Sequence, residues 1–263
     1  MHQEPLTYLY GRHAVREALR NGERLQKVYV LYGHRCGAEI RSHARQAGVP
    51  CVFLDRQRFG ALAQAAGAAL KDTQGVIALR APMALLSLAD LLQQVGSAEE
   101  GLLLALDGIE DPQNLGAIAR SAEAAGAHGL LLPRHHSAPL TPAALKAAAG
   151  ALLHLPVAQV PNLGAALRVL RQEGWWIIGT APDGEHLCWE PFAEGPLVLV
   201  IGAEHRGMRP SIRALCDRVV RIPLFGKVAS LNASAAAAVL LFEIRRQRQQ
   251  HHAFVGGLTD VSA

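Results

Sequence analysis

Cysteine is scarce in this 263-residue sequence, which has four cysteines and no CxxC pair. They are Cys36, Cys51, Cys188 and Cys216. This spacing favours neither a disulfide framework nor a zinc knuckle, and we expect no metal. The richest apolar run, residues 233–242, is broken by Ser234 and falls short of the about 18 residues that span a bilayer. The N-terminal residues lack the charged-then-apolar pattern of a signal peptide. We therefore predict a soluble, cytoplasmic protein with reduced thiols and no membrane partner.

Acidic residues are in short supply in the first part of the chain. Residues 1–78 hold eleven Lys and Arg against six Asp and Glu, a net charge of +5, whereas residues 79–263 hold fifteen against sixteen, a net charge of −1. A basic surplus on the smaller segment indicates an anionic partner, and RNA, DNA or an anionic surface would each fit. A solvated surface with a chance asymmetry would give the same counts, so charge alone leaves this question open.

Short apolar stretches alternate with amphipathic stretches that end at glycine, which is typical of a compact α/β domain. The predicted helices are 11–22, 37–48 and 56–67, and the predicted strands are 27–33, 49–55 and 75–81. The composition then changes to one short amphipathic helix flanked by Pro82 and by Gly96. We predict an N-terminal domain over residues 1–81 and a linker over residues 82–100.

A second α/β alternation follows, and its first strand, 102–109, is apolar almost throughout. Such a strand is expected in a parallel sheet that is covered on both faces. The remaining predicted strands are 129–133, 155–160, 175–181, 197–204 and 218–224, and the predicted helices are 115–126, 141–150, 162–174, 210–216 and a long one from near Asn232. We predict a second α/β domain over residues 101–250 and a tail over residues 251–263.

The helix at 115–126 has an unusual distribution of side chains. The stripe expected to face the core is Leu115, Ile118, Ala119, Ala122 and Gly126. Arg120 lies nearly opposite, on a face that otherwise carries Ala117 and Ala124. A helix with small residues on both sides is usually packed on both sides, so we expect Arg120 to point into a crevice or toward a partner subunit. Its side chain would lean back over Gly116 toward Asn114. The alternative is a capping asparagine and an ordinary surface arginine.

The segment VIGAEHRGM places polar residues where a strand ends in a loop. The strand ends at Gly202, which allows a ligand to approach the backbone closely, and Glu204 and Arg206 follow before a helix that begins with proline. The loop matches neither GxGxxG nor GxxxxGK[ST], so nucleotide phosphate binding is poorly supported. A plain strand–turn–helix connection is the alternative.

The segment VASLNASAAAAVLLFE opens the final helix. Ser230 or Asn232 either caps this helix or faces a ligand. The helix is apolar on nearly every face as far as Glu243, which predicts that its first half is buried. Three arginines follow on what we expect to be an exposed end, where they could contact phosphates or favour the helix dipole. They are Arg245, Arg246 and Arg248.

In this order and spacing, the three segments resemble the signature motifs of the SpoU (TrmH-like) branch of the SPOUT methyltransferases. DPQNLGAIARSAEAAGA is similar to the first motif, VIGAEHRGM with VVRIPL to the second, and VASLNASAAAAVLLFE to the third. The segments YLYGRHAVREAL, TQGVIA and AAAGALLHLPVAQVPNL resemble the two-domain members that methylate a guanosine ribose of bacterial 23S rRNA. The resemblance covers residues 7–248.

This resemblance implies a small N-terminal domain similar to the ribosomal-protein L30e/L7Ae fold, which binds RNA. It also implies a SPOUT α/β domain with a C-terminal trefoil knot, a homodimer, and S-adenosyl-L-methionine as the cofactor. The cofactor-binding positions that it implies are Thr180, Gly202, Ile222 and Leu231.

The implied reaction is methyl transfer to a ribose 2′-OH, which needs an oriented hydroxyl, help in removing its proton and a positive site for the oxyanion. Arg120 matches the arginine of the family, often described as the base. Because an arginine pKa above about 12 makes a neutral guanidine costly at neutral pH, we favour a role in which Arg120 polarises the hydroxyl and holds the oxyanion, with a phosphate sharing the proton. The residues that would orient Arg120 and the ribose are Asn114, Glu204, Ser230 and Asn232.

Three other interpretations compete with this one. A tRNA 2′-O-methyltransferase of the same family would share all three motifs. A non-catalytic RNA-binding protein could dispense with Arg120 or Asn232, and both are present. A nucleotide-dependent oxidoreductase would need a glycine-rich turn after the strand at 102–109, and DGIEDPQN is not such a turn.

Overall fold

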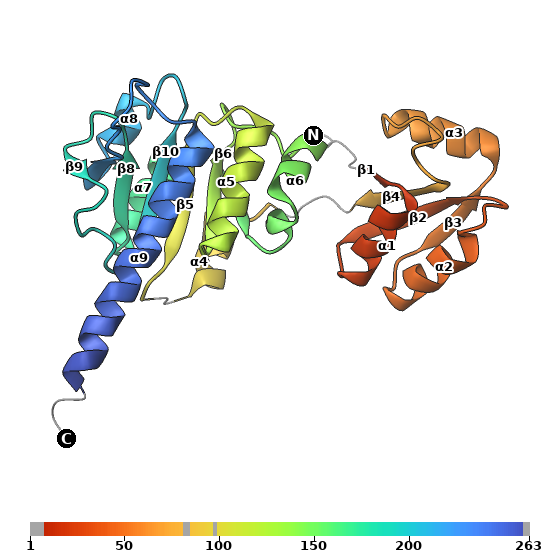
Figure 1. The fold of residues 1–263 in the computed structure, drawn as a ribbon, viewed down its shortest axis with the longest axis horizontal. Coiled ribbons are helices and arrows are strands. Elements are labelled where there is room, and N and C mark those ends of the chain that lie inside the picture. The colour runs from red at the N-terminus through yellow and green to blue at the C-terminus, as the bar shows by residue number, and fades with distance from the viewer. Residues whose placement is uncertain (1–7, 81–84, 97–98, 260–263) are drawn as a thin grey trace. The chain divides into compact units, whose positions relative to one another are not determined.

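The computed structural model describes residues 8–80, 85–96 and 99–259, with side chains up to residue 250. The chain divides into two compact units, Met1–Met83 and Ala84–Ala263 (Figure 1). Each unit has its own sheet, so both predicted α/β alternations are present.

The first unit is a four-stranded sheet with helices on both faces. Its strands are β1 (Tyr8–Tyr10), β2 (Leu25–Leu31), β3 (Cys51–Leu54) and β4 (Val76–Arg80), and its helices are α1 (Arg12–Arg20), α2 (Gly37–Gln46) and α3 (Arg56–Ala65). The strand order is β1-β4-β2-β3, with β2 and β3 parallel and β4 antiparallel to both of its neighbours. Val15 of α1 and Ile40 of α2 pack in one core, and Phe59 of α3 packs with Ile77 in the other. The sequence did not predict β1, because three residues are too few to show an alternation.

The second unit is built on a seven-stranded sheet in which every neighbouring pair of strands is parallel. The strand order is β7-β6-β5-β10-β8-β11-β9. The strands are β5 (Leu102–Asp107), β6 (Gly129–Pro133), β7 (Val157–Val160), β8 (Trp176–Thr180), β9 (His186–Leu187), β10 (Leu197–Gly202) and β11 (Arg218–Arg221). All six residues of β5 are buried, as its apolar run predicted for a sheet covered on both faces.

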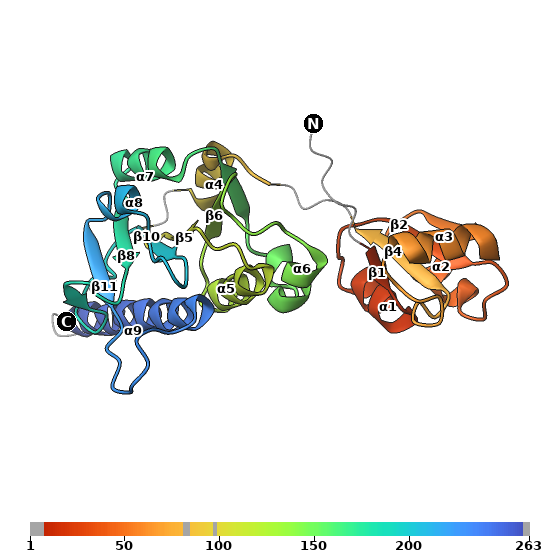
Figure 2. The same cartoon turned by 90° about the horizontal axis from the view of Figure 1, so that it is seen from above.

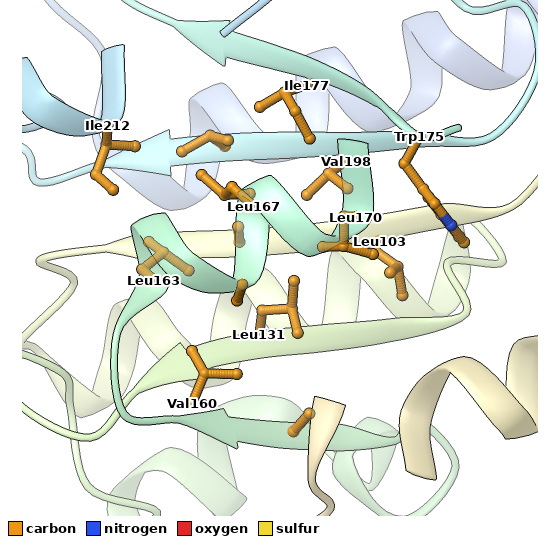
Figure 3. Packing of buried hydrophobic residues seen from close by; sticks show 14 of the residues in the cluster. Leu103, Leu131, Val160, Leu163, Leu167, Leu170, Trp175, Ile177, Val198 and Ile212 are labelled. Carbon is orange, nitrogen blue, oxygen red and sulfur yellow. The ribbon is translucent and has the colours of Figure 1, made fainter. Parts of the chain in front are cut away.

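Helices cover both faces of this sheet. They are α4 (Leu88–Val95), α5 (Pro112–Ala124), α6 (Pro142–Ala148), α7 (Leu163–Gln172), α8 (Pro210–Arg213) and α9 (Ala233–Thr259), with a 3-10 turn η1 (Ala151–Leu153). Figure 2 shows α4, α7 and α8 on one face, and α5 and α9 side by side on the other, with α6 beside α5. On the α7 face, Leu163, Leu167 and Leu170 project onto strand residues such as Leu131 and Val198 (Figure 3). Their spacing of three and four residues places them on one side of the helix.

The segment predicted as a linker contributes to the second unit. Ser87 and Asp90 form a capping box at the start of α4, and Leu91 of this helix is fully buried in the core on the α7 face. Leu86 pairs with Ala158 beside β7. Residues 85–96 are therefore packed structure, because an amphipathic helix stabilises itself by burying its apolar side.

Two predictions about α5 need correction. Leu115, Ile118, Ala119 and Ala122 are buried as expected, but Gly126 is exposed and ends the helix with a φ of 67°. Gly116 does not leave room for Arg120. It is buried against α6, where an added Cβ would lie 2.3 Å from the carbonyl oxygen of Ala144. A side chain at position 116 would therefore push the two helices apart.

The predictions for α9 also hold only in part. Ala237, Leu240, Leu241 and Ile244 are buried, but the opposite side of the helix, with Ala235, Val239 and Phe242, is exposed. The expected exposed arginine end is wrong for Arg248, which is 3% exposed. Its guanidinium donates to the carbonyl oxygens of Ala193, Glu100, Gly101 and Gly195. Arg245 is half-buried and donates to the carbonyl oxygens of Ala125 and Gly126.

Candidate active site

The carboxyl ends of β8, β10 and β11 open into a cavity of about 570 Å³. Parallel strands end at the same edge of a sheet, and ligands bind at this edge in open α/β folds. The four predicted cofactor positions, Thr180, Gly202, Ile222 and Leu231, all line the cavity. Glu204 and Ser230 line it as well, so six of the nine predicted site residues share one cavity.

Gly202 lies where the backbone of β10 meets the loop that follows it. Ala203 and Gly207 exchange two backbone hydrogen bonds, which close the tight turn around Glu204 and Arg206. A Cβ at position 202 would lie 2.3 Å from the backbone nitrogen of Met208. The glycine therefore lets the turn fold back against the strand, and this turn forms one wall of the cavity.

Asn114, Glu204 and Asn232 meet beside the cavity, although they are far apart in the sequence. The Asn232 side-chain Nδ2 donates to Oδ1 of Asn114 at 2.9 Å and to Oε2 of Glu204 at 3.4 Å. One residue from each sequence motif thus joins a single hydrogen-bonded cluster, which we call the Asn–Glu cluster. Such bonds fix the rotamers of all three side chains, a requirement for any group that must orient a substrate.

The alternative roles for these residues are now resolved in part. Asp111, and not Asn114, caps α5, because its side chain accepts a hydrogen bond from the backbone N–H of Gln113. Asn232 does cap α9: its Oδ1 accepts from the backbone N–H groups of Ser234 and Ala235. The side-chain amide of Asn232 therefore has two roles. Its oxygen caps α9, and its nitrogen holds the Asn–Glu cluster together.

Arg120 is the predicted site residue that joins neither the cavity nor the Asn–Glu cluster of its own chain. It is exposed and does not line the cavity. Across the described residues of the chain, no hydrogen-bond or ion-pair partner of Arg120 is present. A charged side chain with no partner and no core contact has no visible role in stabilising this chain.

Sequence reasoning missed Asp107, which is buried at the end of β5. Its carboxylate accepts hydrogen bonds at 2.7 Å from both the backbone N–H and the Nε of Arg209. This contact ties the strand before the first motif to the loop of the second motif. The signal was available, because Asp107 ends an otherwise apolar strand, LLLALD, and a buried carboxylate needs such partners.

Two opposite charges also line the cavity. Arg213 NH1 donates to Oδ1 of Asp183 at 2.7 Å. This hydrogen bond lowers the pKa of Asp183 and raises the pKa of Arg213 relative to their ordinary values. Both groups therefore stay charged at neutral pH.

The described part of the chain contains neither a candidate metal-binding cluster nor a candidate membrane-spanning helix. Between residues 8 and 250, outside the gaps at 81–84 and 97–98, no group of three or more His, Cys, Asp and Glu side chains could hold a metal ion. Among the helices that the structure describes, none is long and apolar enough to cross a bilayer.

The sequences of both units match known protein families. Residues 101–242 match the SpoU rRNA Methylase family, and residues 8–82 match the family described as RNA 2′-O ribose methyltransferase substrate binding. The 23S rRNA (guanosine-2′-O-)-methyltransferase RlmB of Escherichia coli K12 is 40% identical over 91% of this chain and 98% of its own length. An uncharacterized tRNA/rRNA methyltransferase of Synechocystis is 40% identical over 94% of this chain, and the chain spans 64% of that relative's length.

Solved structures agree with these sequence matches. The SpoU methyltransferase AviRb from Streptomyces viridochromogenes, in complex with the cofactor AdoMet, superposes with a TM-score of 0.75 at 26% identity. That superposition covers 93% of this chain and 91% of AviRb. An RNA 2′-O ribose methyltransferase structure superposes with a TM-score of 0.67 at 28% identity, over 94% of this chain and 90% of the other. The chain belongs to the SpoU rRNA methylase family.

Proposed function

We propose that this protein transfers a methyl group from S-adenosylmethionine to a ribose 2′-OH of RNA, and that its substrate is a guanosine of 23S rRNA. The observation that carries the proposal is the Asn–Glu cluster beside a cavity at the carboxyl edge of a parallel sheet. The choice of 23S rRNA over tRNA rests on the RlmB relatives, whose length the chain covers almost completely.

The cavity suits the cofactor in size and in chemistry. Its volume of about 570 Å³ lies within the usual range for small-molecule sites. Ile222, Leu224, Leu231 and Leu240 give it an apolar wall for the adenine ring. Gly202 and the turn after it line the cavity, so backbone groups there can bind the polar parts of the molecule.

The residues of this chain would act on the ribose. S-adenosylmethionine supplies an electrophilic sulfonium methyl when it is bound. Asn114 and Glu204, held by Asn232, would orient the 2′-OH, and Ser230 would contact the ribose from the cavity wall. Arg120 would polarise the hydroxyl and hold the developing oxyanion. A guanidinium is a poor general base at neutral pH, which favours this role over proton removal.

The domain assignments follow the family resemblance. We assign RNA binding to the first unit, whose sheet and helices suit an L30e/L7Ae-like domain and whose sequence matches the substrate-binding family. We assign a trefoil knot to the segment between β10 and α9, because the loops 203–208 and 229–231 meet on one cavity. A ribosomal RNA substrate would place the protein in the cytoplasm.

The open face of α5 and α9 is the surface that we assign to a homodimer. On α9, Ala235, Val239 and Phe242 are exposed at helical spacing, with Phe242 54% exposed. On the adjacent α5, Ala124 and Arg120 are exposed as well. An exposed apolar helix face beside a catalytic residue marks an interaction surface, and a two-fold axis would pair it with itself. Arg120 would then complete the site of the partner chain.

Replacing Phe242 with glutamate should weaken this dimer. The wild-type protein should sediment at twice the 28.1 kDa chain mass, and Phe242→Glu should raise the dimer dissociation constant about tenfold or more, because an unpaired carboxylate would be buried. Val169→Glu, at an exposed apolar position on α7, is the matched control and should leave the dimer intact. A wild-type monomer, or equal effects of both variants, would rule out this surface.

The proposed activity is tested in two steps. Calorimetry with S-adenosylmethionine in EDTA should show one class of site per chain, because the cavity needs no metal to bind the cofactor. Unmodified 23S rRNA and tRNA transcripts are then incubated with protein and cofactor, and 2′-O-methylation is mapped by resistance to alkaline hydrolysis. One methylated guanosine in 23S rRNA is expected. Methylation of tRNA alone would favour the alternative substrate, and cofactor binding that requires added metal would contradict the proposed site.

A further inference from the structure

A second cavity lies on the first unit. It has a volume of about 270 Å³ and is lined by Arg12, His13, His34, Arg35 and Gln74. These residues come from the start of α1, the turn before α2 and the turn before β4. Among the residues of this unit that the structure describes, no carboxylate lines this cavity, which we call the basic pocket.

In the basic pocket, the side-chain acceptor atoms already accept hydrogen bonds from the protein, whereas N–H donors remain available to a ligand. Gln74 adopts a φ of 48°, uncommon for a residue with a side chain, and its Oε1 accepts the backbone N–H of Arg12 at 3.1 Å. The NH₂ group of Gln74 therefore remains as a donor. Nδ1 of His13 lies 3.1 Å from NH2 of Arg16. A guanidinium can only donate, so His13 accepts at Nδ1 and carries its proton on Nε2.

His34 follows the same pattern. Its Nδ1 lies 2.9 Å from the Cys36 sulfur and accepts the backbone N–H of Cys36 at 3.5 Å. Burial raises the pKa of the Cys36 thiol, and its S–H donates to the carbonyl oxygen of Gln74 at 3.8 Å. The backbone N–H of Cys36 is the donor that fixes Nδ1 of His34 as an acceptor. The proton of the imidazole is therefore on Nε2. The His34 ring lies over Gly75, where an added Cβ would be 2.5 Å from the ring, and this contact holds the ring in place.

The arginines of the basic pocket lack counter-ions. Within the described residues, Arg12 and Arg35 form no ion pair. Two carboxylates come from the same segments as the pocket residues, Glu39 of α2 and Asp72 of the turn before β4. Glu39 is engaged by Arg16 at 3.2 Å, and Asp72, exposed in the turn before β4, does not line the pocket. All five lining side chains thus offer N–H donors, two of them with full positive charge. A site of donors without acceptors suits the oxygens of an anion.

We propose that the basic pocket binds a phosphate of the RNA backbone. Phosphate oxygens accept from several donors at once, and guanidinium groups match their geometry. The pocket lies on the unit that carries the net charge of +5 over residues 1–78. This inference deepens the proposed function and rests on it, because it locates where the substrate RNA is held.

The test compares two double variants of the full-length protein. Arg12→Gln with Arg35→Gln removes both charges from the basic pocket, and Arg41→Gln with Arg45→Gln removes two exposed charges from α2 of the same unit. Binding of unmodified 23S rRNA is measured by filter retention over a series of KCl concentrations. The pocket variant should lose about tenfold or more in affinity, and its salt slope should fall by about 1 to 2. The control should change much less, and calorimetry should show the same cofactor affinity for both.

A second arm distinguishes RNA phosphate from a free anion. Histidine-labelled protein is titrated with a short RNA oligonucleotide or with inorganic phosphate at the same phosphate concentration, and the ring signals of His13 and His34 are followed by NMR. Shifts with the oligonucleotide alone are expected. Equal shifts with inorganic phosphate, or equal losses of RNA affinity in the two double variants, would overturn the proposal. A wild-type protein that binds the cofactor but no 23S rRNA would instead contradict the proposed function, and the inference with it.

Discussion

Replacing Arg120 with alanine should lower methyl transfer by about a hundredfold or more, on the order of 3 kcal/mol, as expected for the loss of one oxyanion-stabilising donor. Stability and cofactor affinity should be nearly unchanged, because Arg120 is exposed and does not line the cavity of its own chain. Single-turnover transfer to 23S rRNA measures the effect, and a melting curve and a cofactor titration accompany it.

Two further variants sharpen this prediction. Arg120→Lys should restore little activity, since an ammonium lacks the planar fork that holds ribose and phosphate oxygens together. Arg168→Ala removes an exposed arginine from α7, on the opposite face of the sheet, and should leave transfer unchanged. Near-normal turnover by Arg120→Ala, or unfolding of that variant, would show that Arg120 is a surface or structural residue.

Mixed dimers test whether Arg120 acts across the interface. Arg120→Ala and Asn232→Ala chains are each expected to be inactive. If Arg120 completes the partner's site, a dimer with one chain of each kind contains one intact site and one doubly altered site. Mixing should therefore restore part of the activity. No restoration would place Arg120 in the site of its own chain.

Replacing Arg248 with alanine should lower the free energy of unfolding of the second unit by about 3 kcal/mol or more, because several carbonyl oxygens would lose a charged donor in a buried place. Its guanidinium joins residues 100–101 before β5 and residues 193–195 before β10 to α9. Burial lowers the pKa of Arg248 to about 10, so the group is still charged at neutral pH. Urea unfolding at a fixed protein concentration measures the change.

Tryptophan fluorescence suits this measurement, because Trp175, Trp176 and Trp189 are the three tryptophans of the chain and all lie in the second unit. Gln249→Ala, at the exposed neighbouring position, is the control and should be neutral. Arg248→Met keeps most of the side-chain volume without the donors, so it should be destabilised nearly as much as alanine. A stable Arg248→Met variant would mean that packing, and not hydrogen bonding, accounts for the effect.

The basic residues of the first unit and the arginines of α9 illustrate what the sequence says about charge and what it does not. The sequence shows where charged residues lie along the chain, and the fold decides which groups surround them. The sequence places Arg12 and Arg35 in the basic first unit, but 23 residues apart, and only the folded turns bring them into one pocket. It also places Arg245, Arg246 and Arg248 together, and the tertiary structure separates them. Arg246 is exposed and pairs with the buried Glu243, while Arg248 is itself buried. Helical spacing predicts which residues share a side, but not what covers that side.

Local patterns by themselves determined the α/β class and most of the strands and helices, whereas the four proposed cofactor positions came from the family resemblance. An apolar run, a terminal glycine or a proline acts on its immediate neighbours, so these features can be seen without the fold. The motifs also identified the members of the Asn–Glu cluster. Only the tertiary structure decided that Asn232 joins Asn114 and Glu204 while it caps α9, that Gly116 is needed for contact with α6, and that Asp107 holds Arg209. Each of these contacts joins residues that are far apart in the sequence, and local sequence patterns do not predict which distant residues come close in space.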